Sequence, residues 1–170
     1  NIITTTGFGY GDTVKWPLFS QVILLLLMCI GGSAGSTAGG FKVIRGIIIS
    51  RIAKNQILST LSPNRVLTMH VNGAVLDKDT QHKVLKYLAT YVLIVLALIF
   101  IVSLDNNNLM TVVSGVLSCF NNIGPMIGTT DTFSIFSPFS KLLLSFAMIG
   151  GRLEIYPILL LFLPKTWSRR

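Results

Sequence analysis

Charged residues are scarce in this chain of 170 residues. Asp, Glu, Lys and Arg together make up 12% of the sequence, whereas about a quarter of a typical soluble domain is charged. Hydrophobic residues account for 51% of the chain. The scarcity of charge excludes an ordinary soluble domain, and together with the apolar content it predicts an integral membrane protein.

The chain also lacks the residue patterns of catalysis and metal binding. Cys29 and Cys119 lie within apolar segments, where buried free thiols are more common than a disulfide or a metal site. His70 and His82 do not have the spacing of metal ligands, and no nucleophile with its base or pair of carboxylates stands out. We therefore expect no enzyme activity, no transition metal and no cofactor in this chain.

Two apolar runs are long enough to cross a membrane as helices. Residues 84–104 contain a single charged residue, Lys86, and the run at residues 141–163 carries only Arg152 and Glu154 inside it. A helix needs about 20 residues to cross the roughly 30 Å of hydrocarbon in a bilayer. Both runs are therefore predicted to be transmembrane helices.

Three shorter apolar stretches cannot span a bilayer alone. Residues 17–30 and 44–53 are each too short, and we expect them to form one crossing helix that is broken in the middle. Residues 109–121 follow a turn-forming Asp-Asn-Asn-Asn run, and this length is typical of a re-entrant helix. The extended backbone that returns from it is tolerated only where protein buries it or where it lines a water-filled cavity.

The basic residues predict the orientation in the membrane. They gather in and beside the connection at residues 55–82 and in the tail at residues 165–170, whereas the loops on the other side are nearly balanced. Because cytoplasmic loops carry an excess of Lys and Arg, we expect a multi-pass protein of the cytoplasmic (inner) membrane. The net charge of +8 is then explained by the basic residues that orient the protein in the membrane, so nucleic acid is not an expected partner.

The connection carries a hairpin signal. Asn-Gly at residues 72–73 is flanked by stretches rich in β-forming residues at 65–71 and 74–76. This pattern predicts a small cytoplasmic β-hairpin. It is either a linker or a docking surface for a cytoplasmic partner, and the sequence favours neither.

One pattern occurs twice and predicts the architecture. Each copy has a glycine-centred loop, then a polar stretch, then a proline that opens an apolar helix running into a pair of glycines. Three pairs of positions align at one constant offset: Phe19 with Phe139, Met28 with Met148, and Gly31 with Gly151. Internal repeats dictate architecture, and this one predicts an all-α membrane protein of helix–pore loop–helix repeats as in potassium channels.

The two loops have the composition of an ion-selectivity filter. Rings of backbone carbonyls can replace the hydration shell of potassium, and glycine adopts the required conformations at little cost. Residues 5–9 (Thr-Thr-Gly-Phe-Gly) resemble the Thr-Val-Gly-Tyr-Gly filter of potassium channels at all but one position by residue type. Residues 122–125 keep only the hydrophobe and the central glycine. We expect Gly7 and Gly124 to lie close together near one axis.

Over nearly its whole length, the chain resembles the C-terminal half of a Trk-type potassium uptake protein (the TrkH/KtrB family). In that family four pore-loop repeats surround one ion path, and the resemblance implies that this chain holds most of the third repeat and all of the fourth. It assigns potassium-binding filter strands to two groups of residues: Thr5, Thr6, Gly7 and Phe8 in the third repeat, and Asn122, Ile123, Gly124 and Pro125 in the fourth.

The resemblance also implies a division of the chain into four parts. Residues 1–54 would end the third repeat, residues 55–82 would form the cytoplasmic connection, residues 83–163 would form the fourth repeat, and residues 164–170 would be a cytoplasmic tail. Since the chain begins with Asn1 inside a predicted loop, we expect it to be the C-terminal part of a longer protein.

Ten small residues at 31–40 form a second signature. Each glycine in a helix costs about 0.8–1 kcal/mol relative to alanine, so we expect an unwound stretch, although close helix packing of the Gly-xxx-Gly kind also fits the composition. The resemblance implies an intramembrane loop that lies beneath the filter and acts as a gate. The glycines of this gate would be Gly31, Gly32, Gly35, Gly39 and Gly40.

Arg152 is a third signature. A charge near the middle of a spanning helix costs about 2.5–3.5 kcal/mol on insertion scales, so its side chain should face protein or water and have partners. Carbonyl groups of the glycine-rich loop are suitable acceptors for its five donors. The resemblance likewise implies an arginine beside the gate. A structural ion pair with a residue elsewhere in the longer protein is the alternative interpretation.

The partners follow from the same resemblance. It implies a homodimer in a lipid bilayer that binds cytoplasmic nucleotide-binding regulatory subunits of the TrkA/KtrA type, with potassium as the transported ion. Two other functions fit parts of the sequence: the pore-forming part of another cation channel, and a membrane-embedded enzyme whose glycine loops line a substrate cleft. Ion flux through the full-length protein in proteoliposomes separates transport from enzyme activity.

Overall fold

The fold is helical, with one short pair of strands. The computed structural model describes residues 2–8, 13–33, 36, 39–61, 70–71, 74–75, 77–128 and 133–152. The helices are α1 (Leu18–Ile30), α2 (Val43–Leu61), α3 (Lys78–Val102), α4 (Leu109–Phe120) and α5 (Pro138–Arg152). The strands are β1 (His70–Val71) and β2 (Ala74–Val75), and 3₁₀ turns cover Thr13–Lys15, Ser103–Asp105 and Phe133–Ile135.

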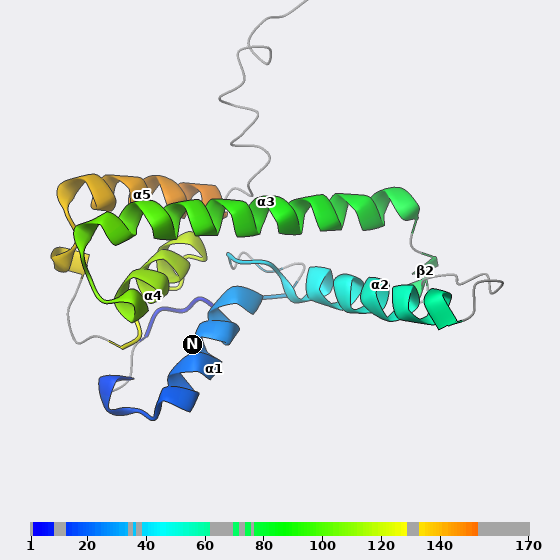
Figure 1. Cartoon of the computed structure of the whole chain (residues 1–170), viewed down its shortest axis with the longest axis horizontal. Helices are drawn as coiled ribbons and strands as arrows, with labels where there is room; N and C mark the ends of the chain where they lie inside the picture. The colour runs from blue at the N-terminus through cyan, green and yellow to red at the C-terminus, as the bar shows by residue number, and fades with distance from the viewer. Residues whose placement is uncertain are drawn as a thin grey trace, which may run out of the picture.

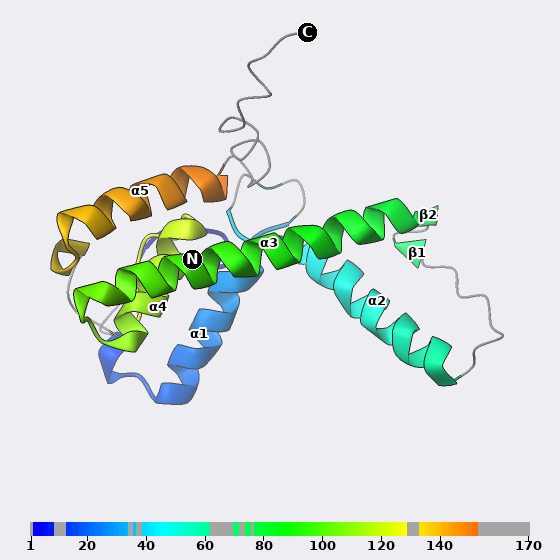
Figure 2. The same ribbon diagram turned by 45° about the horizontal axis from the view of Figure 1, so that its top comes forward.

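The long helix α3 organises the arrangement. Helices α4 and α5 pack against each other and against the C-terminal half of α3, and α1 packs on α4 (Figure 1). Helix α2 lies beside the N-terminal half of α3, and the strand pair sits at that far end (Figure 2). The short helix α4 is therefore enclosed by its neighbours, and nine of its residues are buried.

The amino-acid composition of α4 explains why this helix is buried among the others. Its apolar and small residues leave it no charged face, and the buried set includes Val112, Val116 and Phe120. Gly115 lets Phe136 approach the helix, since a Cβ at Gly115 would lie 3.0 Å from the Phe136 ring. Phe136 is among the largest fully buried side chains. The core of the described chain therefore forms around α4.

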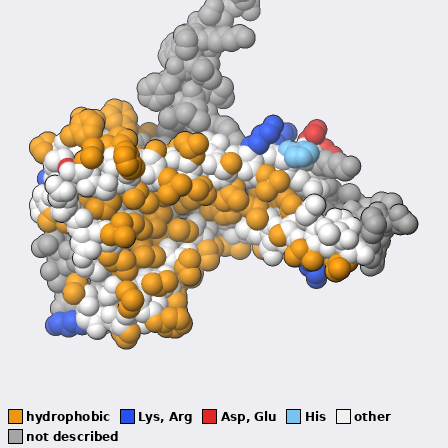
Figure 3. Space-filling model, viewed as in Figure 1, with side chains coloured by type: hydrophobic (Ala, Val, Ile, Leu, Met, Phe, Trp, Pro, Cys, Tyr) orange, Lys and Arg blue, Asp and Glu red, His pale blue; other side chains and the backbone are white. Residues whose placement is uncertain are grey.

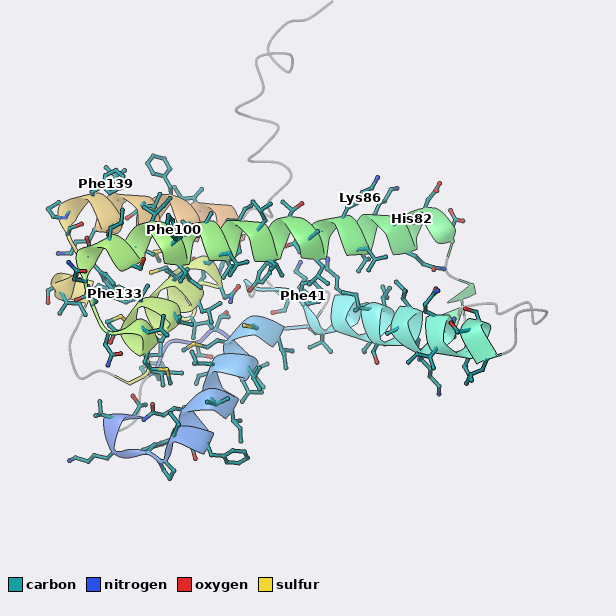
Figure 4. The ribbon with its side chains drawn as sticks, in the orientation of Figure 1. Phe41, His82, Lys86, Phe100, Phe133 and Phe139 are labelled. Atoms are coloured by element: carbon teal, nitrogen blue, oxygen red, sulfur yellow. The ribbon has the colours of Figure 1, made fainter. Side chains whose placement is uncertain are left out.

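Helix α3 presents an apolar surface that the described chain does not cover. It is the one helix among the described residues that is long and apolar enough to cross a membrane, and only 28% of its most apolar window is buried. Exposed apolar side chains continue along it and onto α5, and Figure 3 shows hydrophobic groups spread over this face. Phe100 of α3 and Phe139 of α5, both labelled in Figure 4, are exposed apolar side chains of this surface. Such a surface suits lipid or further protein.

The helices extend into the predicted connection at residues 55–82 from both sides. Helix α2 runs to Leu61 and α3 begins at Lys78, so both ends of that segment are helical. The hydropathy pattern marks where apolar side chains stop, whereas a helix continues through polar residues that favour it. Residues 70–71 and 74–75 pair in antiparallel register around the Asn-Gly dipeptide. The remainder of the predicted hairpin and the tail lie outside the described residues.

The helices that run into the two glycine pairs differ in where they end. Helix α1 stops at Ile30, with Gly31 as its C-cap at φ 68°, and Figures 1 and 2 show that α2 does not continue its axis. Helix α5 instead passes through Gly150 and Gly151 to Arg152. Among the described residues, the helix therefore ends at the glycine pair of the first copy and continues through that of the second, as expected for a break after residue 30 and a continuous run from residue 141.

Two helical glycines give a matched test of the packing at α4. Gly115→Val should lower the free energy of unfolding by about 1–3 kcal/mol because its side chain overpacks against Phe136. Gly46→Val is the control, since a Cβ at Gly46 in α2 meets nothing within 4 Å. Denaturant unfolding of the full-length protein in detergent measures both. Equal stability of the Gly115→Val and Gly46→Val proteins would contradict this packing.

Candidate site at the two glycine loops

The two loops share a pattern of positive φ angles. In the first, Thr5 has φ 51° and Gly7 has φ 84°; in the second, Asn122 has φ 56° and Gly124 has φ 110°. Positive φ therefore recurs at the first and third positions of each loop. Glycine adopts this region freely, and Asn does so more readily than most residues.

The two loops also touch. A Cβ on Gly124 would lie 3.4 Å from Cα of Gly7, and a Cβ on Gly7 would lie 3.0 Å from the carbonyl oxygen of Ile123. The predicted proximity of the two glycines is thus confirmed. A side chain at Gly7 would crowd the facing carbonyl of Ile123, and the positive φ of both glycines disfavours a side chain at either position.

Helix α4 ends in a Schellman motif that starts the second loop. The amide of Asn122 donates to the carbonyl of Cys119 at 3.1 Å, and the amide of Ile123 donates to the carbonyl of Ser118 at 2.9 Å. A residue in the left-handed conformation at this position is the usual way to end a helix, and Asn122 provides it. The helix end therefore fixes where the second loop begins.

The other predicted filter residues lie close by. The hydroxyls of Thr4 and Thr6 are 2.7 Å apart, and Phe8 is 74% exposed. Pro125 and Phe8 line one cavity of about 510 Å³ between the loops and α1. That cavity is lined mostly by apolar side chains, so its lining offers few ligands to a cation. Gly9 and Gly35 lie outside the described residues.

The two ends of the glycine-rich segment, Gly31 on one side and Gly39 and Gly40 on the other, lie against each other. We call this contact the stem of the segment. The chain departs at Gly31 and returns at Gly40, where a Cβ on Gly40 would be 3.2 Å from Cα of Gly31. The amide of Phe41 donates to the carbonyl of Cys29 at 3.4 Å, and that of Val43 donates to Gly32 at 3.1 Å. The described residues between α1 and α2 are not helical. The glycines allow the two arms of the stem to meet.

Asn121 joins this stem to the second loop. Its side chain is fully buried, Nδ2 donates to the carbonyl of Met28 at 2.9 Å, and Oδ1 accepts from the Tyr91 hydroxyl at 3.0 Å. Gly39 packs directly on its backbone carbonyl, and a Cβ on Gly40 would lie 3.5 Å from Oδ1. One residue thus contacts α1, α3 and the stem while it also ends α4.

Aromatic rings hold the outgoing arm of the stem against α3. Phe41 follows Gly40, and its ring centroid lies 6.3 Å from that of Tyr87 and 5.9 Å from that of Tyr91. Tyr91 in turn packs on Phe120 at 5.3 Å. Figure 4 shows Phe41 beneath α3, where α2 begins. These tilted ring pairs, at centroid distances typical of aromatic contacts, fix the end of the glycine-rich segment.

Arg152 is the last described residue of α5, and its side chain is exposed. No described residue of the glycine-rich segment is hydrogen-bonded to it. Next to it, Gly151 packs directly on the carbonyl of Phe120, and the Asn122 side chain donates to the carbonyl of Met148 at 3.0 Å. The contact of Arg152 with the gate loop stays a prediction.

The contact between the two loops is made by their main chains. Within the ranges that the structure describes, no group of three or more His, Cys, Asp or Glu residues could hold a metal ion. The polar groups at the contact of the two loops are instead main-chain carbonyls, which suit weakly bound ions such as potassium.

A helical scaffold with a long exposed apolar helix and two closely packed glycine loops is consistent with a class of membrane transport protein. A family model described as TrkH, cation transport protein, matches residues 2–169. The chain belongs to this TrkH family. Its relatives are potassium uptake proteins, which are transporters and not enzymes.

Individual relatives are similar over almost the whole chain. Trk system potassium uptake protein TrkH of Escherichia coli is 31% identical over 98% of this chain and 35% of the relative. TrkG of the same organism is 32% identical over the same shares. The crystal structure of the potassium transporter TrkH from Vibrio parahaemolyticus superposes with a TM-score of 0.88 at 32% identity, over 98% of this chain and 36% of that one. The chain spans about a third of the length of the relatives it matches.

Replacing Asn121 tests whether it joins the elements. Asn121→Ala removes both side-chain hydrogen bonds, and the Tyr91 hydroxyl and the Met28 carbonyl lose their partner. The free energy of unfolding should fall by about 1–3 kcal/mol, the cost of unpaired buried polar groups. Thermal denaturation of the full-length protein measures the loss. Asn108→Ala is the control, because Asn108 is exposed and makes no side-chain cap bond; an equal loss in both proteins would refute the role.

Proposed function

We propose that this chain forms part of the potassium path of a Trk-type uptake protein in the cytoplasmic membrane. The observation that carries the proposal is the contact of Gly7 with Gly124, in loops that have positive φ at the same two positions. The names of the relatives, which are potassium uptake proteins, support the choice of ion. Proteoliposome flux of potassium through the full-length protein tests it directly, and absence of flux from a correctly inserted protein would reject it.

The filter strands in this proposal are residues 5–8 and 122–125. Their carbonyl oxygens would replace the water shell of a dehydrating potassium ion, as carbonyl rings do in potassium channels. Positive φ at alternate positions supports this role, because it turns successive carbonyls toward one side. Two further repeats of the longer protein would supply the remaining strands.

The parts of the chain are assigned accordingly. Residues 1–54 end the third pore-loop repeat, with α1 and α2 as the halves of one broken inner helix. Residues 55–82 are the cytoplasmic connection, residues 83–163 are the fourth repeat with α4 as its pore helix, and residues 164–170 are the tail. The short length of α4 supports a re-entrant helix.

The glycine-rich segment is the gate in this proposal. Its pinched stem lies against Asn121, the residue just before the second filter strand, so the segment starts beneath the filter. Arg152 at the end of α5 is the proposed latch, because a guanidinium can donate to several loop carbonyls at once. Movement of the loop away from the axis would open the path.

The proposed assembly is a homodimer in the lipid bilayer with cytoplasmic nucleotide-binding regulatory subunits. The phrase "Trk system" in the names of the relatives supports partner subunits. On this chain the basic connection and the tail are the surfaces that face the cytoplasm. The strand pair at the end of α2 and α3 is a suitable docking element, since it stands away from the helices around the site (Figure 2).

Changing either filter glycine should weaken potassium preference. Gly7→Ser and Gly124→Ser each add a Cβ in a positive-φ conformation, against the facing strand. The ratio of potassium to sodium flux in proteoliposomes should fall roughly tenfold, since about 1.4 kcal/mol of lost discrimination is a factor of ten.

Gly46→Ser is the control for the filter test, because that position in α2 has open space. It should leave the ratio unchanged. If both filter variants keep the ratio of the unaltered protein, these glycines do not belong to the filter.

Removing the latch should open the gate. Arg152→Ala should raise potassium flux without regulatory ligand about tenfold or more, because each charged hydrogen bond contributes about 1.5–3 kcal/mol. Shortening the loop between Gly32 and Gly39 should have the same effect. Lys141→Ala is the control: Lys141 is also a basic residue of α5, but it donates to Ser134 at 3.2 Å, away from the loop. Unaltered basal flux in a folded Arg152→Ala protein removes Arg152 as the latch.

A further inference from the structure

One face of α4 carries buried hydroxyl groups. Thr111, Ser114 and Ser118 are spaced by three or four residues, so they share a face of the helix, and each is at most 5% exposed. Buried hydroxyls need hydrogen-bond partners. Ser114 Oγ donates to the carbonyl of Ile127 at 2.9 Å, and Ser118 Oγ accepts from the amide of Gly124 at 3.0 Å. The hydroxyl face is therefore directed at the second loop.

Ser118 holds two successive peptide groups of that loop. Its backbone carbonyl accepts from the amide of Ile123 at 2.9 Å, and its hydroxyl accepts from the amide of Gly124 at 3.0 Å. The structure has no cis peptide bonds among the described residues, and in a planar trans peptide the C=O points opposite to the N–H. The carbonyls of Asn122 and Ile123 must therefore both point away from α4.

The direction of the Ile123 carbonyl agrees with this reasoning. Its oxygen lies 3.0 Å from the position that a Cβ on Gly7 would take, so it faces the first loop. Two consecutive carbonyls on the same side cannot arise in a regular strand, where they alternate. The left-handed residues on either side, Asn122 and Gly124, make this arrangement sterically accessible.

We propose that Ser118 is a positioning residue for ion selection: its hydroxyl fixes the peptide between Ile123 and Gly124 and so aims the Ile123 carbonyl at the ion path. This inference rests on the proposed potassium function. The Asn122 carbonyl is held by the backbone of the Schellman motif alone, whereas the Ile123 carbonyl depends on a side chain. Gly124 gives little resistance to rotation of that peptide, so the Ser118 hydroxyl is its principal restraint.

The chain offers a set of matched variants. Ser118→Ala removes the acceptor, and Ser118→Thr keeps it. Ser118 lines a cavity of about 240 Å³ between α4 and α5, which leaves room for the added methyl group. Ser145→Ala is the control, because Ser145 lines the same cavity but its hydroxyl donates within α5, to the carbonyl of Lys141 at 2.9 Å.

The experiment is the potassium-to-sodium flux ratio of the full-length protein in proteoliposomes. Ser118→Ala should lower the ratio roughly two- to tenfold, the range that corresponds to loss of one neutral hydrogen bond, while potassium flux itself persists. Ser118→Thr should restore most of the ratio, and Ser145→Ala should not change it. If Ser118→Ala does not insert, Ser118→Cys replaces it, since sulfur is a weaker acceptor in a side chain of similar size.

The outcomes separate this inference from the proposed function. If the unaltered protein has no preference for potassium, the proposed function fails. If the unaltered protein is selective and Gly124→Ser loses selectivity, but the folded Ser118 variants keep the full ratio, the positioning role of Ser118 is overturned and the function stands. A fall in ratio for Ser118→Ala that Ser118→Thr reverses supports the role.

Discussion

Two stretches of main chain that are far apart in the sequence meet with no side chain between them, at Gly7 and Gly124. Main-chain groups brought this close must direct their polar atoms to a partner, since an unpaired carbonyl away from water is costly. An unhydrated cation is one such partner. Most of the described architecture can be understood as a means of keeping these two strands in place.

Helix α4 provides that support on one side. It is enclosed by α1, α3 and α5, it ends in the Schellman motif at Asn122, and its Ser118 bonds the next two amides. Asn121 extends the same support to the stem of the glycine-rich segment through Met28 and Tyr91. The proposed filter and gate are therefore both supported by the C-terminal end of α4. A displacement of the stem can be transmitted through Asn121 to the second filter strand.

Sequence reasoning located the helices and the glycine loops, because hydropathy, proline and glycine act locally. It set α4 within one residue of its observed end and placed the break after α1 at the first of the small residues. It did not identify Ser118 or Asn121, whose roles depend on contacts made only in the folded chain. A period of three to four in the hydroxyls of an apolar helix was the available signal for Ser118, whereas Asn121 had no signal beyond its place after the helix.

The proposed role of the carbonyls between the two loops is to bind a potassium ion. The most direct measurement is anomalous X-ray scattering from crystals of the full-length protein grown with rubidium, which replaces potassium and can be identified by its absorption edge. We expect an anomalous peak between the strands of Gly7 and Gly124, in contact with the carbonyl oxygens of Asn122 and Ile123. Ordered loops with no peak between them, at a rubidium concentration that supports transport, would contradict it.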